Sequence, residues 1–99
     1  MATFMTRIEL HEAVYQDYVN LHTYMRQEGF ATTILSDDGV RYQLPPAEYA
    51  LTANCTVVQA REKASRAAQK TLKRHAVLTA EYSGASWIGL TAVQQRAFG

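Results

Sequence analysis

The spacing of the apolar residues changes along the chain, and no other feature of the sequence constrains the fold as strongly. The side chains of residues 3–10 alternate between two faces, one of which carries Phe4, Thr6, Ile8 and Leu10. This alternation predicts a strand that buries one face. Residues 14–28 change to spacings of three and four, which align Val14, Tyr18, Leu21 and Met25 on one side of a helix. A helix with such a stripe is expected to cover a sheet.

Turn residues mark the next boundaries. Gly29 is expected to end the first helix in the left-handed conformation, with Phe30 folded back on the last turn. The pair Asp38-Gly39 predicts a type I′ turn, in which both central residues have positive φ. The two strands of this hairpin are expected over 31–36 and 40–44.

Two prolines and a capping motif organise the middle of the chain. Pro45-Pro46 interrupts the hairpin because proline has no backbone N–H, and pairing can resume over 48–51. Thr56 and Gln59 form a capping box, which predicts the start of a second helix. We expect this helix to end at His75, with an apolar side made of Val57, Ala60, Ala64, Ala67, Ala68 and Thr71.

The last segments are extended again, since 76–82 and 86–93 flank Ser83-Gly84-Ala85 and predict a terminal hairpin. The predicted order is strand, helix, hairpin, helix, hairpin. It indicates an α+β fold of the ferredoxin-like βαββαβ type, with two helices on one face of an antiparallel sheet and an extra C-terminal hairpin strand. A different small α+β sandwich with the same elements is the alternative. At 99 residues the chain suits a single domain, 1–99.

Charge is unevenly distributed, although the formal net charge is only +1. Segment 61–74 has six basic residues and one acidic residue, for a charge of +5, and the rest of the chain carries −4. Helical spacing places most of these cations in one stripe, which ends at Arg74: Lys63, Arg66, Lys70, Lys73 and Arg74. Such a stripe can bind the phosphates of a nucleic acid. The alternative is a solvated helix face with cations near its C-terminus.

Acid–base chemistry has its best candidates after the first strand, at His11 and Glu12. A histidine can exchange a proton near neutral pH, and Glu12 or Glu9 could orient it or hold a divalent metal. Alternatively, Glu12 favours the N-terminus of the following helix and His11 is solvated. His22 is expected to pack at the edge of the helix stripe, and His75 to interact with the C-terminus of the second helix.

Other sites are weakly indicated. Base-stacking surfaces require exposed aromatic residues in strands, and the candidates are Tyr42, Tyr49, Tyr82 and Trp87. The histidines lack the spacing of a metal site, and glycine-rich phosphate loops and nucleophile elbows are absent, so we expect no cofactor and no metal. Cys55, the single cysteine, cannot form an intramolecular disulfide and is expected to be a small buried residue. The lack of a possible disulfide predicts a reducing compartment. No apolar run approaches the ~18 residues of a membrane span, so no membrane span and a cytoplasmic location are predicted.

Several short motifs resemble those of a family of small bacterial proteins that includes the GhoS-type endoribonuclease antitoxin. They are Thr6-Arg-Ile-Glu-Leu, Leu21-His-Thr-Tyr-Met25, Gly29-Phe30 with Thr33-Ile34, Asp38-Gly39, Tyr42-Gln-Leu44 and Glu48-Tyr49. The resemblance covers roughly residues 3–90 and implies a ferredoxin-like fold similar to small CRISPR-associated adaptation nucleases. It also implies cleavage of a messenger RNA that encodes a membrane toxin. Those nucleases have an aspartate at the end of the first strand, where this chain has Glu9, His11 and Glu12.

Two functional hypotheses follow. In the first, the protein is an RNA-binding, antitoxin-type endoribonuclease whose partner is single-stranded RNA, with His11 and Glu12 as acid and base. The basic residues bind the RNA backbone, so changing Lys70 and Lys73 to glutamate is expected to abolish binding while the fold is retained. In the second, it is a non-enzymatic interaction module that forms a homodimer or binds a protein partner through a sheet edge or the open sheet face.

Overall fold

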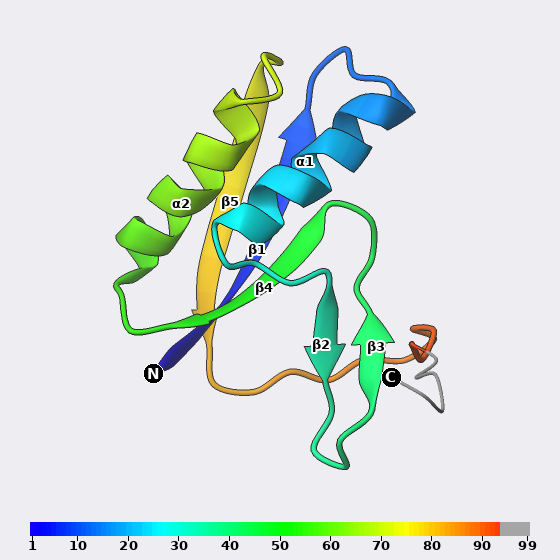
Figure 1. Cartoon of the computed structure of the whole chain (residues 1–99). Coiled ribbons are helices and arrows are strands. Elements are labelled where there is room, and N and C mark those ends of the chain that lie inside the picture. The colour runs from blue at the N-terminus through cyan, green and yellow to red at the C-terminus, as the bar shows by residue number, and fades with distance from the viewer. Residues whose placement is uncertain (94–99) are drawn as a thin grey trace.

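A computed structural model describes residues 1–93 as an α+β fold with two helices and two antiparallel sheets (Figure 1). The three-stranded sheet has the order β4-β1-β5, and β2 and β3 pair separately. Residues 94–99, which the predicted domain includes, lie outside the described residues. The elements are β1 (Ala2–Leu10), α1 (Tyr15–Gln27), β2 (Thr33–Leu35), β3 (Arg41–Gln43), β4 (Glu48–Ala53), α2 (Val57–Gln69) and β5 (His75–Tyr82).

The topology confirms the predicted fold class, because this arrangement is compatible with a ferredoxin-like βαββαβ fold. The central strand β1 pairs antiparallel with both β4 and β5. In the ferredoxin-like arrangement a further strand would pair with the outer side of β4. Here that pairing is reduced to one bridge, in which Ala31 and Ala50 exchange two backbone hydrogen bonds of 2.8 and 2.9 Å. Beyond this bridge the chain leaves the sheet as the β2–β3 hairpin.

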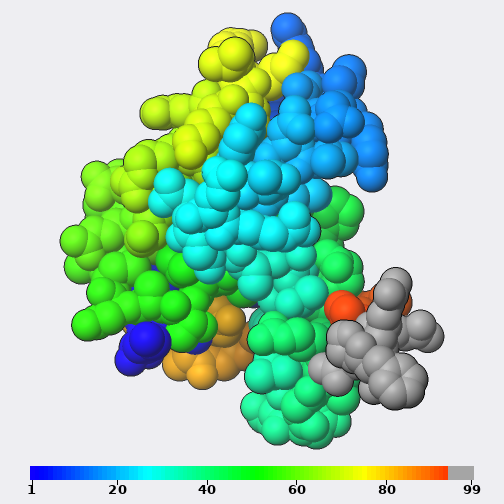
Figure 2. All heavy atoms as spheres, viewed as in Figure 1, coloured from blue at the N-terminus to red at the C-terminus, as the bar shows by residue number. Residues whose placement is uncertain are grey.

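The core lies between the helices and one face of the sheet. Phe4, Thr6, Ile8 and Leu10 are all buried, as the alternation in β1 predicts. On α2 the buried residues are alanines only: Ala60, Ala64, Ala67 and Ala68. These small side chains let the helix lie close to β1 and β5. Figure 2 shows α1 and α2 covering most of the sheet on this side.

The end of α1 forms as predicted. Gly29 has φ +96°, and its N–H donates to the Arg26 carbonyl at 2.9 Å. The Phe30 N–H donates to the Met25 carbonyl at 3.0 Å, and the Phe30 ring is buried. These two hydrogen bonds define a Schellman motif. At the other end the prediction for Val14 is wrong: it is the N-cap residue and is 66% exposed, because the helix begins one residue later.

Helix α2 begins as predicted and ends earlier. The Gln59 N–H donates to Thr56 Oγ1 at 3.1 Å, and the Thr56 N–H donates to Gln59 Oε1 at 2.9 Å, which completes the capping box. The predicted end at His75 is wrong, because the last helical residue is Gln69 and Leu72 has φ +64°. His75 instead begins β5, opposite Leu10 of β1. Lys73 and Arg74 therefore lie in a loop.

The first hairpin prediction changes in detail, and the prediction of a C-terminal hairpin is wrong. The Asp38-Gly39 turn is not of type I′, since only Gly39 has positive φ, and the loop has three residues between Ser36 and Val40. This is the usual loop in which a type I turn is followed by a left-handed glycine. At the C-terminal side, segment 86–93 pairs with β3 rather than with β5, through the bridge between Tyr42 and Ala92.

Candidate nucleic-acid interface

Two loops meet at the end of β1. Leu10 pairs with His75 at the start of β5, so the residues that follow β1 lie beside those that precede β5. The His11 N–H donates to the Arg74 carbonyl at 2.8 Å. The strand register thus brings a predicted acid–base residue next to a predicted phosphate-binding residue that is 63 positions away in the sequence.

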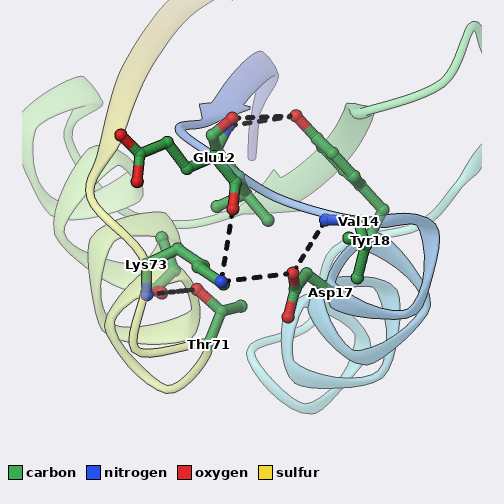
Figure 3. A network of polar contacts seen from close by, with 8 residues as sticks. Glu12, Val14, Asp17, Tyr18, Thr71 and Lys73 are labelled. Atoms are coloured by element: carbon green, nitrogen blue, oxygen red, sulfur yellow. Dashed lines mark hydrogen bonds and ion pairs between the residues drawn. The ribbon is translucent and has the colours of Figure 1, made fainter.

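Lys73 connects these loops to α1 (Figure 3). Its Nζ donates to the Glu12 carbonyl at 3.2 Å and lies 3.7 Å from Asp17 Oδ2. The Asp17 carboxylate also accepts the Val14 N–H at 2.9 Å, which satisfies the first turn of the helix. The Lys73 side chain is 35% exposed, so it holds the loop and still faces solvent.

His11 and Glu12 have different surroundings. The His11 side chain is 41% exposed, and its Nε2 lies 3.9 Å from Glu9 Oε1. Glu12 adopts φ +52°, and in Figure 3 its carboxylate points away from Lys73 and Asp17. The carboxylate placed next to the imidazole is therefore that of Glu9, whereas Glu12 contributes its backbone carbonyl to the lysine contact.

Three of the five predicted phosphate-binding residues have partners within the molecule. Arg66 Nη2 lies 3.1 Å from Glu28 Oε1, and Lys70 Nζ lies 5.8 Å from the centre of the Tyr24 ring. Lys73 is the third. Among residues 1–93, Lys63 and Arg74 form no ion pair. Because α2 ends at Gln69, Lys70, Lys73 and Arg74 follow the helix and the five residues do not form one continuous helical stripe. Of the five, Arg74 bonds to His11 through its backbone carbonyl, and Lys73 precedes it.

The aromatic candidates separate into two groups. Tyr49 is fully buried in the core, so the prediction that it offers a stacking surface is wrong. Tyr42, Tyr82 and Trp87 line a cleft of about 530 Å³, in which the rings of Tyr42 and Trp87 pack edge to face at 5.5 Å. The cleft also contains Asp37 and Asp38.

Asp38 keeps this cleft acidic. The hydrogen bond from the Ser36 hydroxyl, and then that from the Val40 N–H, lower the pKa of its carboxyl group and favour the ionised form. A negatively charged cleft repels a phosphate backbone. The aromatic rings of this cleft therefore lie beside negative charge that opposes contact with an RNA backbone.

Sequence reasoning missed a polar pair inside the molecule. His22 Nδ1 and the Tyr49 hydroxyl are 2.7 Å apart, with ring centres at 5.6 Å, so His22 packs as predicted but also carries a hydrogen bond into the core. Burial is the main cause that lowers the pKa of His22, and the charge of Arg26 adds to it. Burial also raises the pKa of Tyr49. The only sequence signal was two polar rings on apolar faces.

Other predicted features have simple positions. Cys55 precedes α2 and is partly buried. In the described part of the chain, no three histidine, cysteine or acidic side chains are grouped as metal ligands would be. No helix within residues 1–93 is long and apolar enough to cross a membrane.

Comparisons with known proteins add no further assignment: no protein-family model matches the sequence, and no curated protein is significantly similar to it.

Proposed function

We propose that the protein binds single-stranded RNA and cleaves it at the end of β1, as an antitoxin-type endoribonuclease. The observation that supports this proposal is the position of His11 beside Lys73 and Arg74, fixed by the 2.8 Å hydrogen bond from the His11 N–H to the Arg74 carbonyl. The imidazole is solvent-accessible, and the loop that adjoins His11 contains two basic residues, Lys73 and Arg74. The family resemblance in the sequence agrees with this activity.

The residues suit a transesterification of the RNA backbone. His11 accepts the proton of a 2′-hydroxyl, and the 2′ oxygen then forms a bond to the adjacent phosphorus. The bond from phosphorus to the 5′ oxygen breaks, that oxygen takes a proton from water, and a 2′,3′-cyclic phosphate remains. Arg74 and Lys73 stabilise the negative charge that builds up on the phosphoryl oxygens. Glu9, at 3.9 Å, orients the imidazole, and Glu12 is the alternative acid.

Cleavage is tested with end-labelled single-stranded RNA on a denaturing gel, with and without a chelator. We expect His11→Ala to lose cleavage by about 100-fold or more, the usual contribution of a general base. The matched control is His75→Asn, because asparagine can keep the contact to the Lys73 carbonyl that His75 Nδ1 makes at 2.8 Å. Equal cleavage by His11→Ala and the wild type would overturn the catalytic role. Loss of cleavage with the chelator would replace it with a metal-dependent one.

Binding is tested separately by fluorescence anisotropy at several salt concentrations. Arg74→Glu removes a cation with no ion pair among the described residues, so we expect weaker binding and a salt slope that is smaller by about 1 or more. The control is Arg41→Glu on the β2–β3 hairpin, whose exposed side chain donates to Thr33 Oγ1. If Arg74→Glu and Arg41→Glu weakened RNA binding equally, only the net charge of the protein would matter, and Arg74 would not contact the RNA.

A second candidate function is self-association through β5. This strand is at an edge of the three-stranded sheet, and Leu78 on it is 70% exposed. An uncovered edge with an apolar side chain is a template for pairing with a second copy. Light scattering after size-exclusion chromatography tests this function. A dimer that dissociates in Leu78→Lys and binds no RNA would favour the interaction module over the nuclease.

A further inference from the structure

Near the end of β1, the side of this strand that faces β4 is hollowed. One hollow of about 480 Å³ has Ile8, Glu9 and Tyr18 in its lining, and a second of about 260 Å³ adjoins it. The two hollows share four lining residues, which are Tyr15, His22, Pro46 and Ala47. We refer to them together as the Tyr15 cleft.

The Tyr15 cleft exists because β4 begins too late to cover all of β1. Pairing between the strands stops at Arg7 and Glu48. Ala47 accepts the Ile8 N–H at 3.1 Å and, with φ +64°, turns the chain away. The chain that precedes β4 therefore does not continue the pairing along the end of β1.

At the end of β1, the backbone groups of Leu10 already have a hydrogen-bond partner. The Tyr18 hydroxyl accepts the Leu10 N–H at 3.1 Å and donates to the Leu10 carbonyl at 3.4 Å (Figure 3). An added peptide strand would have to break these bonds before it could pair with β1. The cleft consequently suits a ligand that uses side chains rather than a β-strand.

The side chains of the cleft offer a stacking surface, a carboxylate and an imidazole nitrogen. The Tyr15 ring is 83% exposed at the start of α1 and lines both hollows. Glu9 provides a carboxylate. His22 Nδ1 and the Tyr49 hydroxyl are 2.7 Å apart, so this ring nitrogen already has a partner in the core. His22 Nε2 is the ring nitrogen left for a hydrogen bond with a ligand, as donor or acceptor according to the tautomer.

We propose that the Tyr15 cleft holds one base of the single-stranded RNA whose backbone lies at His11. The base stacks on Tyr15 and forms hydrogen bonds to Glu9 and His22. Glu9 connects the cleft with His11, since Glu9 lines the cleft and its Oε1 lies 3.9 Å from His11 Nε2. This inference rests on the proposed function, and it assigns the part of the substrate that the backbone contacts do not specify.

The test compares two synthetic RNAs of one length, a normal oligonucleotide and one with abasic positions, by anisotropy with wild type, Tyr15→Ala and Tyr15→Phe. Stacking of a base on an aromatic ring predicts that Tyr15→Ala weakens binding of the normal RNA by about 5- to 150-fold. Tyr15→Phe keeps the ring and should bind like the wild type. The abasic RNA should bind all three proteins equally. The exposed position of Tyr15 keeps the core intact in both variants, and circular dichroism checks this.

The outcomes separate the two proposals. If the wild type binds neither RNA, the proposed function fails and the base subsite fails with it. If the wild type binds RNA with a salt dependence that Arg74 controls, but Tyr15→Ala binds the normal RNA equally well, only the subsite is overturned. A loss in Tyr15→Ala that is the same for the abasic RNA also overturns it, because the ring would then act on the backbone.

Discussion

The two helices end in different ways, and the difference decides where the functional residues lie. Helix α1 ends at Gln27 and is closed by Gly29, which takes the left-handed conformation at little steric cost. After α2, the left-handed residue is Leu72, with φ +64° and an exposed fraction of 91%. A leucine in this conformation is strained, so the surrounding structure must impose it.

The strain has a visible origin. Leu10 pairs with His75, so the chain must reverse between the end of α2 and the first residue of β5. The short connection leaves no room for another helical turn. By stopping α2 at Gln69, the reversal moves Lys73 and Arg74 off the helix and beside His11. The strained helix end thus assembles the candidate site.

The helices also differ in what they bury. The buried face of α2 consists of alanines, which do not titrate. Helix α1 places Leu21 and Met25 in the core, and His22 at its edge bonds to the buried Tyr49 hydroxyl. Any dependence of helix packing on pH near neutrality should therefore come from α1 rather than from α2.

The largest effect on the free energy of unfolding is expected at Gly29, which follows α1. Gly29→Ala forces an alanine to φ +96° and brings its Cβ to 3.5 Å from Leu51 Cδ1. We expect a loss of about 1–2 kcal/mol in the free energy of unfolding, the usual cost of a left-handed residue with a side chain. Thermal denaturation measures it, with a fall in Tm of about 4–8 °C for each kcal/mol.

The matched control for this change is Gly84→Ala. Gly84 does not have positive φ, and an added Cβ there meets no atom within 4 Å. Its replacement should leave the Tm unchanged or raise it slightly. If the two variants lost the same stability, the left-handed conformation of Gly29 would not be what ends α1.

The contrast between the helix ends also shows what the sequence could predict. Gly29 with Phe30, and Thr56 with Gln59, are local signals that act within one turn of helix, and both formed as predicted. The alternation in β1 likewise gave the correct buried face. Fold class was predictable because these local patterns agree with one another.

The early end of α2 was not predictable, because residues 70–74 include good helix formers. The helix is stopped by the pairing of His75 with Leu10, which lies 65 positions earlier in the sequence. The same limit applies to the site. His11 and Arg74 were each named from the sequence, but their adjacency follows from the β1–β5 register. The Tyr15 cleft, which depends on where β4 starts, gave no local signal.

A smaller effect is expected from pH, through His22. Burial and Arg26 lower its pKa below that of a free histidine, so the unfolded chain takes up the proton first as pH falls. The free energy of unfolding should then be highest above about pH 6.5 and decrease as the pH falls below it. Urea unfolding at about pH 7.5 and 5.5 measures this.

Two variants assign the pH effect to α1. His22→Asn removes the titrating group and can keep a hydrogen bond to Tyr49, so its urea midpoint should change less between the two pH values. His75→Asn, at the start of β5, should keep the dependence of the wild type. If His75→Asn removed the dependence instead, the titrating group would be His75 at the start of β5 and not His22 on α1.

The smallest effect on the free energy of unfolding is expected at Leu72, which follows α2. Leu72→Gly relieves a left-handed leucine, worth about 1–2 kcal/mol, but glycine costs about 0.5–1 kcal/mol in backbone entropy. The net result is a gain of about 0.5–1 kcal/mol in the free energy of unfolding, measured by urea denaturation. Leu72→Ala, which keeps the Cβ, controls for loss of the exposed side chain and should have no effect. If Leu72→Gly were stabilised but lost RNA binding, a fixed backbone at Leu72 would be what holds Lys73 and Arg74 beside His11.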